Sequence, residues 1–160
     1  MVAHVLSLSQ DVAAPPERVW EVLTDLPGTA AVLTGVTRIE VLTDGPYAVG
    51  TRWRETRRVF GREETQEMWV GAVDPPRSTV VRARAGGIDY DTTFTLEPSG
   101  AGTALTMEFR GEDTSTSRLK RLVETLTAPL GRSVTRKIMR RDLEDIAAAA
   151  EGRPSENAGS

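Results

Sequence analysis

The chain has 160 residues, of which 39% are hydrophobic and 27% charged, and its 20 basic and 23 acidic side chains leave a net charge of −3. This size and composition predict one domain, and the near balance of charge argues against nucleic acid or an anionic membrane surface as a partner. The absence of cysteine and the single histidine, His4, exclude disulfides, thiol nucleophiles and His-rich metal sites, so we expect neither a metal nor a cofactor.

No apolar run is long enough to span a membrane, and no basic leader precedes the first residues. We therefore expect a cytoplasmic protein that does not insert into a membrane.

The N-terminal part of the chain predicts one strand followed by two short helices. Residues 5–12 alternate loosely between apolar and polar side chains, as a strand does. The pair Pro15-Pro16 ends this strand, and Pro16 can open a helix over residues 16–23 because the first turn needs no proline N–H. Residues 25–28 break that helix, and residues 29–33 predict one further turn before Gly35.

From Val36 onward the hydrophobic period falls to two, and Gly- or Pro-containing turns recur about every ten residues. This rhythm predicts an antiparallel meander of six strands. The predicted strands cover residues 36–43, 50–59, 62–73, 78–85, 88–97 and 103–110.

The charges across the turn Phe60-Gly61 predict the register of its hairpin, since opposite charges favour direct pairing. Pairing Val59 with Arg62 sets arginines against glutamates, whereas a slip of one residue sets Glu55 against Glu67. The predicted pairs are Arg58 with Glu63, Arg57 with Glu64 and Arg54 with Glu67. The predicted concave face of this hairpin carries Trp53, Glu55, Arg57, Glu64, Gln66, Met68 and Val70.

After Gly111, apolar residues recur at helical spacing down to Ala150 and predict a long amphipathic helix with an N-cap at Ser115 or Ser117. Pro129 predicts a kink or a break in that helix. We expect residues 1–150 to form the domain and residues 151–160 to form a disordered tail.

An apolar sheet face needs a cover, and only the C-terminal helix is long enough to supply it. The aromatic supply, 3 Trp, 3 Phe and 2 Tyr, is small for filling the space between seven curved strands and one helix. We therefore expect an internal cavity of the kind that binds apolar ligands.

This order of elements resembles the START-like helix-grip superfamily (SRPBCC, polyketide cyclase/dehydrase-like) over residues 2–150. The pieces that carry the resemblance are residues 13–25 (AAPPERVWEVLTD), 49–51 (VGT), 73–77 (VDPPR) and 102–106 (GTALT). The resemblance implies an α+β helix-grip fold, in which a seven-stranded curved antiparallel sheet wraps around the C-terminal helix. Members include lipid carriers, plant allergen and hormone-binding proteins, coenzyme Q-binding proteins, chaperone activators and aromatase/cyclases, so the resemblance implies a ligand cavity without one reaction.

The candidate ligand-binding residues are Trp53, Glu55, Arg57, Gln66, Met68, Tyr90, Phe94 and Met107. Glu55 and Arg57 can orient a polar ligand edge, and an arginine can stabilise an enolate. The alternative is a structural ion pair between Arg57 and Glu64 at the sheet rim. Trp53 and Tyr90 can stack on an aromatic ligand or simply pack in the core, and no catalytic residue can be assigned.

The first functional hypothesis is binding of a small apolar or polycyclic ligand, such as a lipid, a quinone or an aromatic polyketide. If the protein is an enzyme, the resemblance suggests a polyketide cyclase/dehydratase that acts on a poly-ketone bound to an acyl carrier protein. The third hypothesis is a protein-interaction module that acts through its outer surface and a basic stripe, Arg132, Arg136, Arg140 and Arg141. A solvated helix face paired with Glu144 and Asp145 is the favoured explanation of that stripe, and the oligomeric state stays open.

Overall fold

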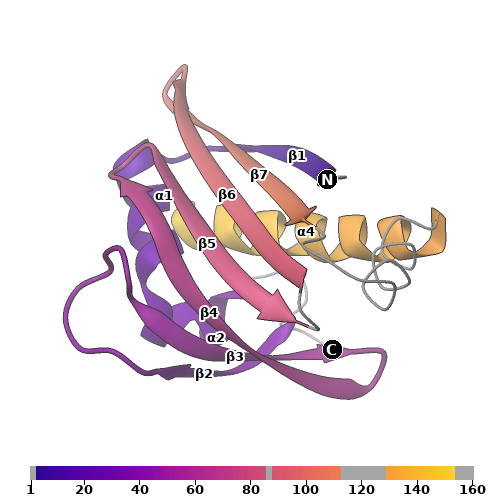
Figure 1. Ribbon diagram of the computed structural model, residues 1–160. Helices are drawn as coiled ribbons and strands as arrows, with labels where there is room; N and C mark the ends of the chain where they lie inside the picture. Colours follow the sequence, from indigo (N-terminus) through magenta and orange to yellow (C-terminus); the bar gives the residue numbers. More distant parts are fainter. Residues whose placement is uncertain (1–2, 86–87, 113–128, 154–160) are drawn as a thin grey trace.

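The structure is a computed structural model that describes residues 3–85, 88–112 and 129–153 (Figure 1). Within these residues, seven strands form one antiparallel sheet in the order β1-β7-β6-β5-β4-β3-β2. The strands are β1 (Ala3–Val12), β2 (Val36–Val41), β3 (Arg52–Val59), β4 (Arg62–Asp74), β5 (Ser78–Ala85), β6 (Ile88–Ser99) and β7 (Gly102–Glu112). The helices are α1 (Pro16–Thr24), the short 3-10 helix η1 (Leu26–Gly28), α2 (Thr29–Val32) and α4 (Pro129–Ala150).

The predicted helix-grip fold is confirmed: the curved sheet wraps around α4, and two short α-helices follow the first strand (Figure 1). The break predicted at residues 25–28 is a 3-10 turn in which the Asp25 side chain accepts a hydrogen bond from the Gly28 N–H at 3.3 Å. No helix in the described ranges has the length and apolar character needed to cross a membrane.

The predicted register of the β3–β4 hairpin is also confirmed, with Val59 opposite Arg62 and Arg57 opposite Glu64. Phe60 and Gly61 form the turn, both with positive φ angles of 52° and 75°. The ion pairs on the outer face are partly diagonal to this register, since Glu67 contacts Arg52 at 2.9 Å rather than its direct neighbour Arg54.

A β-bulge helps to curve the sheet. The pairing of β4 with β5 shifts register between Val70 and Ala72, which leaves Gly71 as an extra residue on β4. Bulges bend a strand and increase its local twist.

Helix α4 packs mainly on β1, β7 and α1, on one side of the sheet. Its residues Leu143 and Ile146 join a core cluster with Leu6 of β1 and Leu105 of β7. A separate core cluster lies under β3, β4 and β5, and consists of Leu26, Trp53, Val70 and Val81. On the β3–β5 side of the sheet, Leu26 of η1 belongs to the core cluster in place of residues from α4.

Both ends of α4 bear on the sequence predictions. The described helix begins at Pro129, while the N-cap candidates Ser115 and Ser117 lie outside the described residues. At the other end Gly152 has a φ of 74°, and the N–H groups of Gly152 and Arg153 donate to the carbonyls of Ala149 and Ala148. This is a Schellman cap, so residues 151–153 of the predicted tail belong to the helix end, and residues 154–160 lie outside the described part.

Candidate functional site

A cavity of about 300 Å³ lies between the two core clusters. The first helix and the turns after it close one end, the sheet forms the curved wall, and α4 forms the opposite wall. Its large apolar lining residues are Val22, Leu23, Leu26, Val32, Leu33, Trp53, Met68, Val81, Phe94, Met107, Phe109, Ile138, Met139 and Ile146. The predicted cavity is therefore present, and its position follows from the one-sided packing of α4.

One charged cluster interrupts this apolar lining. The Arg57 Nε donates to Glu55 Oε1 at 2.6 Å. The two terminal nitrogens of Arg57 donate to the Asp142 carboxylate, Nη1 to Oδ1 at 3.1 Å and Nη2 to Oδ2 at 2.8 Å. Arg57 thus links Glu55 of its own strand to Asp142 of α4.

The sequence explains how these three side chains meet. Glu55 and Arg57 are two residues apart on β3, so strand alternation points both toward the concave face. Asp142 lies four residues from both Ile138 and Ile146, which line the cavity from α4, so helical spacing places all three on one face.

The cluster is buried and contains more negative than positive charge. Asp142 is 3% exposed and Glu55 8% exposed, and a third carboxylate, Asp145, is buried one turn further along α4. Asp145 Oδ2 accepts hydrogen bonds from the Thr34 backbone N–H at 2.9 Å and from the Thr34 hydroxyl at 2.8 Å.

Burial and charge shift the proton affinities of this cluster. Burial raises the pKa of Asp142 above its ordinary value, Arg57 opposes the rise, and the carboxylates of Glu55 and Asp145 reinforce it. For Arg57, burial alone would lower the pKa, but the charges of Asp142 and Glu55 outweigh burial and raise it. Arg57 therefore stays a cation, while Asp142 is a carboxyl with increased proton affinity on the wall of a largely apolar cavity.

The structure brings together seven of the eight candidate residues. Those that line the cavity are Trp53, Glu55, Arg57, Gln66, Met68, Phe94 and Met107. Gln66 is exposed as well as lining the cavity, which places it at the mouth. Contact of these residues with a ligand stays a prediction.

Tyr90 is not among the described residues that line the cavity. Its ring stacks on Phe109, with centroids 5.5 Å apart and planes at 17°. It also lies over Gly111, where an added Cβ would come within 3.4 Å of the ring. Tyr90 therefore lies beside the cavity rather than in its wall, because it stacks on Phe109 and because Gly111 has no side chain to occupy the space under the ring.

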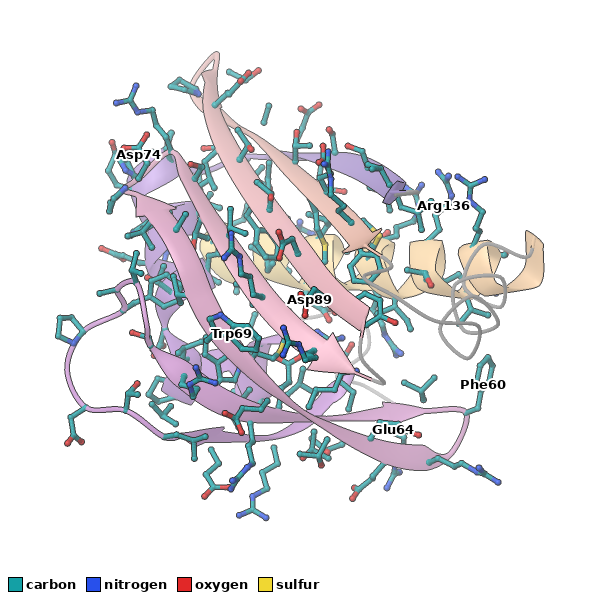
Figure 2. All side chains as sticks on the ribbon, viewed as in Figure 1. Phe60, Glu64, Trp69, Asp74, Asp89 and Arg136 are labelled. Carbon is teal, nitrogen blue, oxygen red and sulfur yellow. The ribbon has the colours of Figure 1, made fainter. Side chains whose placement is uncertain are left out.

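The alternative pair of Arg57 with Glu64 is not what the structure shows. Glu64 lies opposite Arg57 in the register, but it is exposed near the turn of the hairpin, as Figure 2 shows, and Arg57 turns to Glu55 and Asp142 instead. The buried carboxylates of Glu55 and Asp142 attract the Arg57 guanidinium more strongly than the exposed Glu64 does, because the lower dielectric of the interior strengthens the attraction.

Sequence reasoning missed Asp142 and Tyr47. The signal for Asp142 was a carboxylate inside the apolar stripe of the C-terminal helix, between positions 138 and 146. Tyr47 comes from the long β2–β3 connection; its hydroxyl lies 2.8 Å from the Thr79 hydroxyl and its ring meets Trp20 edge-on at 6.3 Å. Nothing in the sequence pattern around Tyr47 predicted that this residue lines the cavity.

The basic stripe is partly as predicted. Arg132, Arg136, Arg140 and Arg141 are all exposed, and Figure 2 labels Arg136 on α4. Asp145, however, is not a solvated partner of that stripe, because it is buried against Thr34.

His4 lies on β1 opposite Gly111, and its side chain is outside the described part. The described residues contain no group of three or more His, Asp or Glu that could hold a metal ion.

The family described as polyketide cyclase/dehydrase and lipid transport matches residues 3–151 of the chain. No curated protein is significantly similar to it in sequence.

Several solved structures share the fold. The ZhuI aromatase/cyclase from Streptomyces sp. R1128 is 20% identical, with a TM-score of 0.77 and coverage of 99% of this chain and 100% of that one. A major latex-like protein from Panax ginseng is 11% identical, with a TM-score of 0.74 and coverage of 94% and 99%. The di-domain aromatase/cyclase BexL of the BE-7585A biosynthetic pathway is 14% identical, with a TM-score of 0.68, and the match covers 96% of this chain and 50% of BexL. At these identities the likeness shows the fold alone.

Proposed function

Because the chain belongs to the polyketide cyclase/dehydrase and lipid transport family, we propose that it binds a small, largely apolar or polycyclic molecule in the cavity between the sheet and α4. The observation that carries this proposal is the cavity itself. It is a space of about 300 Å³ with an apolar lining and a single charged cluster.

The dimensions and lining of the cavity support a compact ligand. Small-molecule sites in proteins typically measure about 300–1,000 Å³, are mainly apolar and carry a few placed polar groups. This cavity is at the small end of that range, which favours two or three fused rings over a long acyl chain. Trp53 and Phe94 offer flat apolar surface, and the three methionines, Met68, Met107 and Met139, can adapt to ligand shape.

Native mass spectrometry of freshly purified protein, followed by thermal shift against quinones, flavonoid-like aromatics and fatty acids, tests the proposal. A ligand that binds only the folded state stabilises it by RT ln(1 + [L]/Kd), so the unfolding temperature rises with the logarithm of the ligand concentration once that concentration exceeds Kd. We expect a co-purified mass or a rise in Tm with at least one compact aromatic class. If the protein carries no bound mass and no class raises its Tm, the binding function is wrong.

A second candidate function, ring closure or dehydration of a poly-ketone bound to an acyl carrier protein, is favoured by Asp142. Such a reaction needs a positioned group that moves a proton, and a carboxyl of increased proton affinity on the cavity wall suits that role. Arg57 would act as a positioning residue, because its charge is already shared between Glu55 and Asp142.

A reconstituted assay with a carrier-bound poly-ketone tests this second function. We expect the Asp142→Asn variant to change the product distribution, and the Glu64→Gln variant, altered at an exposed position outside the cavity, to leave it unchanged. An unchanged distribution with Asp142→Asn would remove the catalytic hypothesis and leave the binding function standing.

A further inference from the structure

The polar part of the cavity wall carries a net negative charge. Among the described residues that line the cavity, the charged ones are Glu55, Arg57 and Asp142, one cation against two carboxylates. Asp145, buried behind them, adds a further carboxylate close to Asp142. A ligand that enters the cavity therefore meets an excess of negative charge in a low-dielectric setting.

Arg57 does not offer a free anchor for an anion. Its Nε donates to Glu55, and both of its terminal nitrogens donate to Asp142. With both carboxylates ionised, the cluster carries one negative charge in excess of the Arg57 cation. A ligand carboxylate beside this cluster would become a third anion around one guanidinium.

We infer that the cavity selects neutral ligands that present a hydrogen-bond donor, such as a hydroxyl or an amide N–H, to the Glu55 and Asp142 carboxyls. It discriminates against carboxylates and phosphates of the same shape. This inference rests on the proposed binding function and specifies the class of ligand. Its physical basis is that repulsion between like charges grows as the dielectric falls, whereas a donor N–H or O–H satisfies a carboxylate oxygen.

Two probes of matched shape isolate the charge: 2-naphthamide, which is neutral and has N–H donors, and 2-naphthoate, which has the same ring and an anionic carboxylate. Isothermal titration calorimetry at pH 7 compares their affinities for the wild-type protein. We expect the amide to bind at least about tenfold more tightly, the factor that corresponds to 1.4 kcal/mol.

Variants separate the effect of the cluster from the general cost of burying an anion, which any apolar cavity imposes. Glu55→Gln and Asp142→Asn each remove one negative charge and bring the lining to neutrality, so the preference for the amide should fall by about tenfold. Glu64→Gln removes the same charge from an exposed position on the adjacent strand and should keep the wild-type preference.

The outcomes distinguish this inference from the function on which it rests. If neither probe binds and the thermal-shift panel is also negative, the binding function fails. If 2-naphthoate binds as tightly as 2-naphthamide, the cavity binds aromatics but the charge selection is wrong. The same conclusion follows if the amide preference is unchanged in both Glu55→Gln and Asp142→Asn.

Discussion

At the scale of single residues, Arg57 is the cation that allows two carboxylates to be buried in the cavity wall. Two buried carboxylates would each be costly alone, and Arg57 satisfies both through three hydrogen bonds of 2.6–3.1 Å. The Arg57 side chain is 24% exposed, and its aliphatic stem reaches from the rim of the sheet so that the guanidinium lies beside the two carboxylates. The stability of the fold and the chemistry of the cavity therefore depend on the same side chain.

Replacing Arg57 by methionine should lower the free energy of unfolding by about 3–5 kcal/mol at pH 7, because the change leaves Glu55 and Asp142 buried without their cation. Urea unfolding measures the loss. The matched control is Arg54→Met, whose partner Glu40 is at 3.5 Å with both side chains about half exposed, so it should cost less than about 1 kcal/mol. Equal losses in the two variants would contradict the role given to Arg57.

Asp142 should make the protein less stable as the pH rises. Its pKa is raised in the folded state above the ordinary value of 3.8, so the folded protein binds the proton more tightly than the unfolded chain does. Its stabilising contribution is complete below 3.8 and is lost as the pH rises toward the raised value.

Urea unfolding of the wild type and of Asp142→Asn across the acid range isolates this contribution, because asparagine does not titrate. The free energy of unfolding of the wild type should fall relative to that of the variant as the pH rises above 3.8. A constant difference would show that Asp142 has no net pKa shift, and a rise of the wild type relative to the variant would show that the Arg57 pairing outweighs burial.

Residue-level prediction from the sequence worked where the environment is local. Strand alternation placed Trp53, Glu55 and Arg57 on the concave face, because a strand alone fixes which face a side chain points to. It could not find the partner of Arg57, since Asp142 is 85 positions away and only the packing of α4 on the sheet brings it near. The same limit applies to Tyr90, which is not among the lining residues, because its ring stacks on Phe109 of the neighbouring strand.

At the scale of elements, the β3–β4 hairpin shows how charge and turn chemistry cooperate. Arginines and glutamates alternate across it in the one register that opposes unlike charges. Its two-residue turn has positive φ at both positions, which suits glycine at 61 but not phenylalanine at 60. Phe60 is 83% exposed at the tip of the hairpin (Figure 2), so no packing compensates for its strain.

Changing Phe60 to asparagine should raise the free energy of unfolding by about 1 kcal/mol, because asparagine tolerates the left-handed region that costs other residues about 1–2 kcal/mol. Phe60→Ala is the control, since alanine has the same Cβ but lacks the polar side chain whose local hydrogen bonds let asparagine adopt the left-handed region, so it should give no such gain. Urea unfolding at neutral pH compares the two. A gain of equal size with alanine would assign the effect to loss of the exposed ring instead.

The order of elements was predictable because turn residues and hydrophobic periods are local signals that mark each strand and helix. The extent of the C-terminal helix was harder to predict, since Pro129 can interrupt a helix or open one, and the described helix begins there. The β-bulge at Gly71 was not predicted, because nothing in the alternation around it shows which strand holds the extra residue.

At the scale of the whole molecule, the cavity follows from the one-sided packing of α4. The helix fills the space under β1 and β7, and Leu26 of η1 packs against the residues of β3, β4 and β5. The two core clusters form separately, and the gap between them is the cavity. The small number of aromatic residues predicted an internal cavity, but the position of that cavity depends on how far α4 reaches across the sheet.

Filling the cavity should abolish ligand binding without unfolding the protein. Val81→Phe adds volume toward the cavity, where the usual overpacking cost of about 1–3 kcal/mol should be largely avoided. The affinity for 2-naphthamide should fall at least about tenfold, the equivalent of 1.4 kcal/mol, with the thermal unfolding temperature nearly unchanged.

Val80→Phe is the matched control for this change. Val80 is the adjacent residue of β5, so its side chain points to the opposite face of the sheet. Binding that survives Val81→Phe, or that is lost equally in both variants, would show that the ligand does not occupy the cavity.

The most direct test of the central claim uses the methionine methyl groups as reporters. The chain has four methionines, and three of them, Met68, Met107 and Met139, line the cavity. With 13C-methyl methionine and signals assigned by single Met→Leu variants, titration with 2-naphthamide should shift all three signals along one binding curve, and Val81→Phe should abolish the shifts. If calorimetry shows 2-naphthamide bound while these three signals stay in place, the ligand site lies elsewhere and the cavity account is wrong.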